Sequence, residues 1–191
     1  MKVKIKQKQI SKFLIGLIIV ASIIFIAILI SSKTKPSYSV KTPDGTVYSF
    51  RENVKTASKI HVYPDEKTLR ETFLNSNLTD ITFVFIPSDS KTNGYYTVWA
   101  VEFGYKLTQF YNSIGYVNGE ANIAAQAVDS LENVSSESMN LKLVVVPFNQ
   151  ATENKVMVDQ NRIYLYGRTP KEMDYVVIKT ILTVLGNWSL A

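Results

Sequence analysis

The feature that most constrains this chain is an uninterrupted apolar run from Phe13 to Ile30. Its eighteen residues carry no charge, and only Gly16 and Ser22 fall outside the apolar set. As an α-helix rising about 1.5 Å per residue, the run would extend about 27 Å, which is close to the thickness of a bilayer's hydrocarbon core. We therefore expect a transmembrane helix over residues 13–30, with the lipid bilayer as its surroundings.

The charges that flank this run predict its orientation. Residues 1–12 contain five lysines and no acidic residue, whereas only Lys33 and Lys35 follow the run closely. Because basic residues are retained on the cytoplasmic side of a membrane span, the basic tail is expected in the cytoplasm and the chain after Ser31 outside. The pattern predicts a single-pass protein of the cell membrane with an extracytoplasmic C-terminal part.

A cleaved signal peptide has the same order of parts, but two observations favour an uncleaved signal-anchor. The apolar run is longer than the usual signal-peptide core of about 7–15 residues, and residues 28–32 offer no A-x-A cleavage pattern. A type IV pilin also has basic residues before an apolar helix. Its processing site would precede that helix, whereas Gly16 lies inside the run and no acidic residue follows it.

Outside the first twelve residues the chain is electrically balanced. The 191 residues include 21 Lys+Arg and 16 Asp+Glu, and the excess of five is the lysines of the tail. A neutral body argues against nucleic-acid binding, for which a basic surface is expected. A hydrophobic fraction of 46% and the absence of cysteine exclude a disordered chain and a disulfide-stapled miniprotein. The abundance of Ile, Lys and Asn is typical of an AT-rich, prokaryotic genome.

Residues 31–36 read as a short polar linker, and residues 37–191 are enough for one domain with its own core. Strands are expected at 37–40, 46–50, 59–63, 81–87, 141–147, 156–158 and 162–166, helices at 65–75, 95–114 and 170–185, and either kind at 123–128. This order predicts an α/β fold with a mixed parallel and antiparallel sheet and three main helices. The parallel pairs are expected from the two helix crossovers and the antiparallel pairs from hairpins.

Two of the expected helices carry clear local signals. In the helix at 95–114, large apolar residues recur at helical spacing, and Glu102 and Lys106 form an i,i+4 pair on its surface. That stripe consists of Tyr96, Trp99, Phe103, Leu107, Phe110 and Ile114. The last helix opens with Thr169 and Glu172 in the spacing of a capping box and with Pro170 at its first position. Its expected buried stripe is Met173, Val177, Ile181 and Val184.

The sequence offers few means of catalysis. His61 is the only histidine, so one chain cannot assemble a His-based triad or a two-histidine metal site. Its place in a strand is typical of a partly buried histidine bonded to a neighbour. The chain also lacks a GxGxxG fingerprint, a Walker A loop and a GxSxG elbow. These observations favour a non-catalytic protein with no cofactor, no metal site and no catalytic residue.

The polar loop at 88–94 is the segment best placed to bind a ligand. It follows a buried strand and precedes a helix, which is where open α/β sheets bind ligands. Its candidate ligand-binding residues are Ser88, Asp89, Ser90 and Asn93. Asp89, Asn93 and Gly94 match part of a calcium loop, but Lys91 occupies a ligand position and Ala100 stands where the bidentate Glu should be. Turn residues that cap the next helix are the simpler interpretation.

Two further surface features remain open from sequence. Core packing best explains the aromatic stripe, although Tyr95, Tyr105 and Tyr111 lie off it and would form a surface patch. Three sequons permit N-glycosylation outside the membrane, at Asn77, Asn133 and Asn187. Because the chain contains thirteen asparagines, three chance matches are easily expected.

Together these features predict a non-catalytic, membrane-anchored envelope protein whose outward α/β domain mediates protein interaction or assembly. The short linker places its protein partner near the outer membrane surface. The alternative is a tethered ligand-binding or carboxylate-based hydrolytic domain that uses Asp89 with Ser88 and Ser90. A deep polar cleft at the loop would favour the alternative, whereas an exposed apolar patch elsewhere would favour partner binding.

Overall fold

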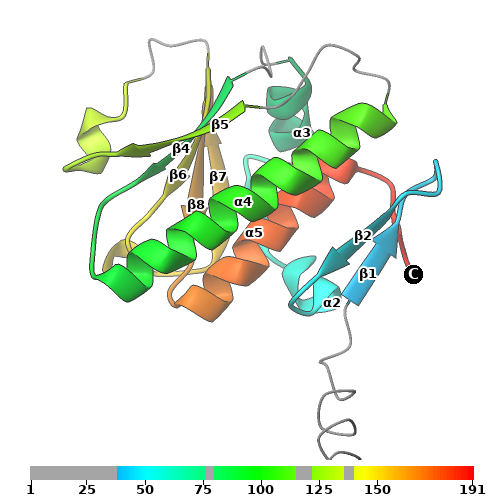
Figure 1. Cartoon of the computed structure of the whole chain (residues 1–191), viewed down its shortest axis with the longest axis horizontal. Coiled ribbons are helices and arrows are strands. Elements are labelled where there is room, and N and C mark those ends of the chain that lie inside the picture. The colour runs from blue at the N-terminus through cyan, green and yellow to red at the C-terminus, as the bar shows by residue number, and fades with distance from the viewer. Residues whose placement is uncertain (1–37, 76–79, 115–121, 136–139) are drawn as a thin grey trace, which may run out of the picture. The chain divides into compact units, whose positions relative to one another are not determined.

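The structure is a computed structural model that describes residues 38–75, 80–114, 122–135 and 140–191 (Figure 1). The expected membrane helix at 13–30, the linker at 31–36 and the sequon residue Asn77 lie outside these ranges. Within the described ranges, no helix is both long enough and apolar enough to cross a bilayer.

The central layer is a six-stranded sheet with the order β3-β7-β8-β6-β4-β5. Its strands are β3 (His61–Tyr63), β4 (Asp80–Phe85), β5 (Asn122–Ala127), β6 (Leu141–Val145), β7 (Lys155–Asp159) and β8 (Arg162–Tyr166). β8, β6, β4 and β5 are mutually parallel, whereas β7 is antiparallel to β8 and parallel to β3. The predicted α/β fold with a mixed sheet is therefore confirmed.

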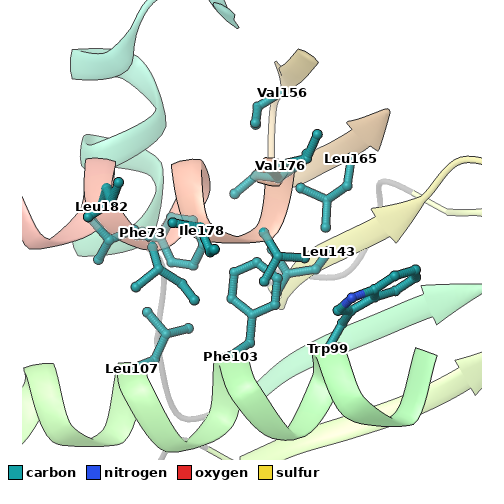
Figure 2. Packing of buried hydrophobic residues seen from close by; sticks show 14 of the residues in the cluster. Phe73, Trp99, Phe103, Leu107, Leu143, Val156, Leu165, Val176, Ile178 and Leu182 are labelled. Atoms are coloured by element: carbon teal, nitrogen blue, oxygen red, sulfur yellow. The ribbon is translucent and has the colours of Figure 1, made fainter. Parts of the chain in front are cut away.

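One face of this sheet packs against helices. They are α2 (Val54–Ala57), α3 (Glu66–Asn75), α4 (Ser90–Ser113) and α5 (Pro170–Leu185), of which the last three are the predicted main helices. α4 and α5 lie side by side in front of the strands (Figure 1). Alternate strand residues such as Leu143 and Leu165 meet Phe103 and Val176 from these helices in the main core (Figure 2). Because α4 packs against this face of the sheet, the position of its first residue relative to the strand ends is fixed.

The opposite face is covered in part by the connection from β5 to β6. Val84 and Val144 point to this face and form a second cluster with Val128 and Val134 of the connection. A short 3-10 turn, η1 (Leu131–Asn133), lies in the same segment. Lys142 is buried here, and its Nζ donates to the carbonyl oxygen of Ser135 at 2.5 Å. β4 and β6 are thus covered on both faces, which explains their nearly continuous apolar runs.

A smaller sheet has the strand order β2-β1-β9. Its strands are β1 (Tyr38–Lys41), β2 (Val47–Phe50) and β9 (Ser189–Leu190). The predicted hairpin of β1 and β2 is confirmed, and its turn places Gly45 at a φ of 92°, which glycine adopts without strain. Tyr48 and Phe50 turn inward and join the main core.

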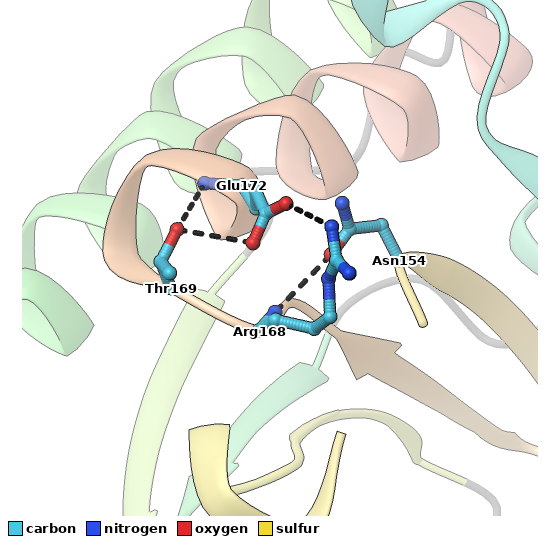
Figure 3. A network of polar contacts seen from close by, with 4 residues as sticks. All are labelled: Asn154, Arg168, Thr169 and Glu172. Atoms are coloured by element: carbon cyan, nitrogen blue, oxygen red, sulfur yellow. Dashed lines mark hydrogen bonds and ion pairs between the residues drawn. The ribbon is translucent and has the colours of Figure 1, made fainter. Parts of the chain in front are cut away.

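The polar start of α5 agrees largely with the predicted capping box (Figure 3). Thr169 Oγ1 accepts a hydrogen bond from the backbone N–H of Glu172 at 3.2 Å. The Glu172 carboxylate accepts from the Thr169 hydroxyl at 3.2 Å and from Arg168 at 2.5 Å. Asn154 Oδ1 accepts from the backbone N–H of Arg168 at 3.1 Å, which joins the β6–β7 connection to the same network.

The structure differs from the sequence-based expectation in several places. The crossover through α3 does not give a parallel neighbour, because β3 lies at the far edge of the sheet and β4 runs antiparallel to it. The ambiguous segment at 123–128 is mostly strand β5, and the short elements α2 and β9 were not expected. His61 is exposed on the edge strand β3 rather than partly buried. Finally, α4 begins at Ser90, about one turn before the expected start.

Candidate functional site

The early start of α4 follows from the side chain of Asp89. Asp89 is the N-cap, and its Oδ1 accepts from the backbone N–H groups of Lys91 at 3.0 Å and Thr92 at 3.1 Å. Its Oδ2 accepts from the Thr92 hydroxyl at 2.7 Å. The hydrogen bond from the Thr92 side chain, followed by that from its backbone, lowers the pKa of the Asp89 carboxyl. Asp89 is therefore an ionised cap at the positive end of a long helix.

The other candidate residues of this segment also form hydrogen bonds within the segment. The Asn93 side chain accepts from the backbone N–H of Ser88 at 3.0 Å and donates to the carbonyl oxygen of Ser88 at 3.0 Å. The Ser88 hydroxyl approaches Asp89 Oδ2 at 3.4 Å, and Ser90 is the first residue of α4. The segment at 88–94 is thus a helix cap and a first helical turn rather than a loop.

This cap lies at the point where the sheet connections change direction. From the carboxyl end of β4 the chain passes through α4 to β5, on one side of β4. From the carboxyl end of β6, the neighbour of β4 on its other side, the chain passes to β7 and β8 in the opposite direction. Connections that diverge in this way leave a crevice at the strand ends, where α/β proteins commonly bind ligands.

A pocket of about 520 Å³ occupies this crevice. It is lined by Ile86, Pro87, Ser88, Asp89, Thr92, Tyr96, Asp129, Pro147, Phe148, Asn149 and Gln150. These residues come from the carboxyl-terminal connections of β4, β5 and β6 and from the first two turns of α4. Two carboxylates line the pocket, and none of the described lining residues is Lys, Arg or His. The pocket therefore favours cations and hydroxyl-bearing groups over anions.

Tyr96 is the most deeply buried polar residue of the pocket lining, with 4% of its surface exposed. Its ring packs 5.0 Å from that of Phe85 and 5.8 Å from that of Trp99, as measured between centroids. Burial raises the pKa of the Tyr96 hydroxyl, and the negative charge of Asp89 raises it further. The hydroxyl is therefore a neutral hydrogen-bonding group at neutral pH, near the Asp89 charge.

A second candidate surface lies on the outer side of α4. Val98, Val101 and Tyr105 follow one another at helical spacing and are 37%, 65% and 69% exposed. Together with Ser49 within β2 and Arg51 just after it, they border a groove of about 340 Å³. We call Val98, Val101 and Tyr105 the outer stripe of α4. Three large apolar or aromatic side chains exposed in a row are typical of a protein-binding surface.

Two charged residues of α4, Glu102 and Lys106, also line the groove beside the outer stripe. Lys106 and Glu102 form the predicted i,i+4 ion pair at 3.0 Å, but their side chains are only 10% and 14% exposed, so the expected surface position is wrong. The Lys106 ammonium lies 4.8 Å from the centroid of the Phe50 ring. The ion pair and the contact with the Phe50 ring together offset the cost of burying the Lys106 charge.

The remaining predicted positions are dispersed. The aromatic stripe of α4 is buried except for Ile114, which is 50% exposed near the end of the helix, whereas Tyr111, expected at the surface, is buried. Asn133 and Asn187 are exposed. In the described part of the chain, no three His, Cys, Asp or Glu side chains are grouped to hold a metal ion.

Sequence reasoning missed Asp129, Asn149 and Gln150, which complete the pocket. Asn149 and Gln150 follow the apolar strand expected at 141–147, and this position is the available signal, whereas Asp129 follows a segment that the sequence leaves open as strand or helix. Their convergence depends on the strand order, which local patterns do not determine.

Comparison with known proteins gives no relative: no family model, no curated protein and no solved structure matches this chain.

Proposed function

We propose that this chain is a non-catalytic, single-pass protein of a prokaryotic cell envelope whose outward domain binds another protein through the outer stripe of α4. Residues 13–30 anchor it in the cell membrane, with residues 1–12 in the cytoplasm and residues 37–191 outside. The observation that carries this proposal is the exposure of Val98, Val101 and Tyr105 on a helix whose other large apolar side chains are mostly buried.

The chemistry of the partner follows from the charges beside the stripe. Among the described residues, Arg51 is exposed and forms no ion pair, whereas Glu102 and Lys106 neutralise each other. The expected partner is a protein segment that places apolar side chains on the stripe and a carboxylate near Arg51. Such a rim charge steers association, while the apolar contact supplies most of the affinity.

The linker limits where the partner can be. Six residues at 31–36 extend to about 20 Å at most, so the domain stays near the membrane that holds its anchor. The partner is therefore expected at the outer membrane surface, in the same envelope layer as the domain.

A photo-crosslinking experiment in native membranes tests the proposal. A benzoylphenylalanine in place of Val101 is expected to give one adduct of defined mass, which Arg51→Glu weakens because it repels the partner's carboxylate. The same probe at Glu71, exposed on α3, is the control and should give no such adduct. Absence of an adduct from position 101, or an adduct indifferent to the charge at position 51, would contradict the proposed partner.

Membrane topology is tested separately. The full chain should remain in membranes after carbonate washing, and its C-terminus should be digested by protease added from outside. Release of a mature form that begins between Ser31 and Lys35 would instead identify residues 13–30 as a cleaved signal peptide.

A second candidate function is ligand binding at the pocket between β4 and β6, and its position at diverging connections favours it. Carboxylate-based hydrolysis is less favoured, because both Asp89 oxygens already accept hydrogen bonds that stabilise the ionised cap. An acid catalyst would need the opposite, a carboxyl group with a raised pKa.

A further inference from the structure

We propose that the pocket between the β4–α4 and β6–β7 connections binds a small organic cation. Its ammonium group would be held by the Tyr96 hydroxyl and the Asp129 carboxylate, with the charge of Asp89 nearby. Its carbon atoms would lie against Phe148 and the two prolines of the lining. This site is distinct from the outer stripe of α4, so it does not depend on the proposed protein partner.

Tyr96 is the observation that points to a ligand. The residue is 96% buried, and no side chain or backbone group of the described residues hydrogen-bonds to its hydroxyl, which is not one of the fully buried atoms that lack a partner. Tyr96 lines the pocket together with Asp89, and the charge of Asp89 adds to burial in raising the pKa of the Tyr96 hydroxyl. The ring is thus packed in the core against Phe85 and Trp99, while the hydroxyl oxygen keeps access to the pocket. A ligand that accepts or donates a hydrogen bond here would satisfy it.

The sign of the ligand's charge follows from the lining. Asp89 and Asp129 are acidic, and Asp129 is exposed and in no ion pair within the described part of the chain. The positive end of α4, which could otherwise attract an anion, is already offset by the Asp89 carboxylate. A phosphate or carboxylate ligand would meet two like charges with no cationic side chain to balance them.

The apolar part of the lining distinguishes an organic cation from a metal ion. Phe148 is half-buried, and its ring is held edge-on to Trp99 at 6.2 Å between centroids. Pro87, Pro147 and Ile86 complete an apolar wall. A hydrated metal ion gains nothing from such a wall, and Asp89 has already committed its oxygens to the helix cap. Alkyl carbons and an ammonium group near aromatic rings match both halves of the lining.

The test uses the full chain in phosphatidylcholine nanodiscs, three organic probes of similar size but different charge, and calcium as a competitor. Saturation-transfer difference NMR measures binding of n-butylammonium, n-butanol and butyrate at constant ionic strength, and calcium chloride is added as a competitor. Saturable binding of butylammonium is expected, with weaker binding of butanol and none of butyrate. Equal or tighter binding of butyrate, or no binding of butylammonium, would overturn the proposal. Displacement of butylammonium by calcium at equal ionic strength would show that the site binds a metal ion, and would also overturn the proposal.

Two substitutions locate the site. Asp129→Asn removes one exposed charge and is expected to weaken butylammonium binding about five-fold, the upper range for an exposed ion pair. Tyr96→Phe removes only the hydroxyl and should weaken binding about three-fold. The matched controls are Glu132→Gln, an exposed acid outside the lining, and Tyr105→Phe on the outer stripe, which should leave the affinity unchanged.

The outcomes separate this site from the proposed partner surface. Asp129 is exposed, so Asp129→Asn should not disturb the fold. If this variant binds butylammonium with unchanged affinity, the cation binds elsewhere and the proposal is overturned. If Tyr96→Phe destabilises the fold, measured by thermal unfolding of the free protein, its hydroxyl has a structural role and the assignment of Tyr96 fails. Neither substitution should change the crosslink from position 101, so failure of one proposal leaves the other standing.

Discussion

The indole N–H of Trp99 donates a hydrogen bond of 2.6 Å to Asp174 Oδ1 and so joins α4 to α5. Trp99 is fully buried and also contacts Tyr95, Tyr96 and Phe148 through its ring. One side chain therefore connects the helix layer, the pocket lining and the β6–β7 connection. Its hydrogen bond satisfies the only polar atom of a large core residue, as buried tryptophans require.

Replacement of Trp99 by alanine should cost about 3–5 kcal/mol in the free energy of unfolding, because it leaves a cavity in the core. Tyr105→Ala on the same helix should change stability by less than about 0.5 kcal/mol, since Tyr105 is 69% exposed. Chemical denaturation followed by near-ultraviolet circular dichroism measures both values. A mild effect of Trp99→Ala would mean that the main core does not depend on this ring.

Asp174 gives a prediction with a defined pH dependence. Burial raises the pKa of its carboxyl, and the nearby charges of Glu102 and Glu52 add to this, while the Trp99 hydrogen bond and Arg51 act in the opposite direction. The folded protein thus binds this proton more tightly than the unfolded chain does. Above the unfolded-chain pKa of about 3.9, stability from this group falls as pH rises toward the folded pKa.

Asp174→Asn should therefore be at least as stable as the parent protein at pH 7, because asparagine keeps an acceptor for Trp99 without the partly buried charge. The advantage should vanish below about pH 3, where the parent carboxyl is protonated in both states. Asp174→Ala instead leaves the indole N–H unpaired and should cost about 1–3 kcal/mol. Thermal unfolding from pH 3 to 7 compares the three proteins, and a destabilised Asp174→Asn at pH 7 would contradict the raised pKa.

The sequence predicts those parts of the fold that depend on neighbouring residues. The cap at Thr169, the apolar strands at β4 and β6 and the buried stripe of α4 follow from local spacing. The far-edge place of β3 and the Trp99–Asp174 bond do not, because they join residues far apart in the chain. The same reason applies to the pocket. Asp89 can be predicted as a site residue because it lies in a polar segment, whereas Asp129 and Gln150 join the site only because β4, β5 and β6 are neighbours in the sheet.

The cap of α5 supplies a further stability prediction. Thr169→Ala removes the acceptor for the Glu172 backbone N–H and should cost about 1 kcal/mol. Thr169→Ser keeps the hydroxyl and should cost less than half of that. Urea denaturation at pH 7 measures the difference between the two variants. Equal losses would show that the threonine methyl group, rather than the cap, stabilises this helix end.

A buried lysine connects three helices and predicts an asymmetric pair of variants. Lys179 Nζ donates to the carbonyl oxygen of Ser58 at 2.9 Å and lies 2.5 Å from Glu66 Oε1, with only 5% of the lysine side chain exposed. Glu66→Gln leaves this ammonium without its counter-charge and should destabilise the protein by about 1–3 kcal/mol. Lys179→Met removes the charge itself and should cost less. Denaturation at pH 7 compares them, and a larger loss for Lys179→Met would show that alkyl and carbonyl contacts outweigh the ion pair.

The last prediction concerns Asp89, because it separates the helix cap from the two proposed binding surfaces. Asparagine caps helices about as well as aspartate, so Asp89→Asn should keep the bonds from the Lys91 and Thr92 backbone and shift Tm by less than about 2 °C at pH 7. The lowered pKa of Asp89 means that its contribution to stability is present above about pH 4 and is lost as pH falls through the folded pKa. The parent protein should therefore lose its small advantage over Asp89→Asn on acidification.

In the Asp89→Asn protein the crosslink from position 101 should persist, while butylammonium binding should weaken because one of the two negative charges of the pocket has been removed. A folded Asp89→Asn protein that loses the position 101 crosslink would show that the pocket, rather than the outer stripe of α4, governs partner binding.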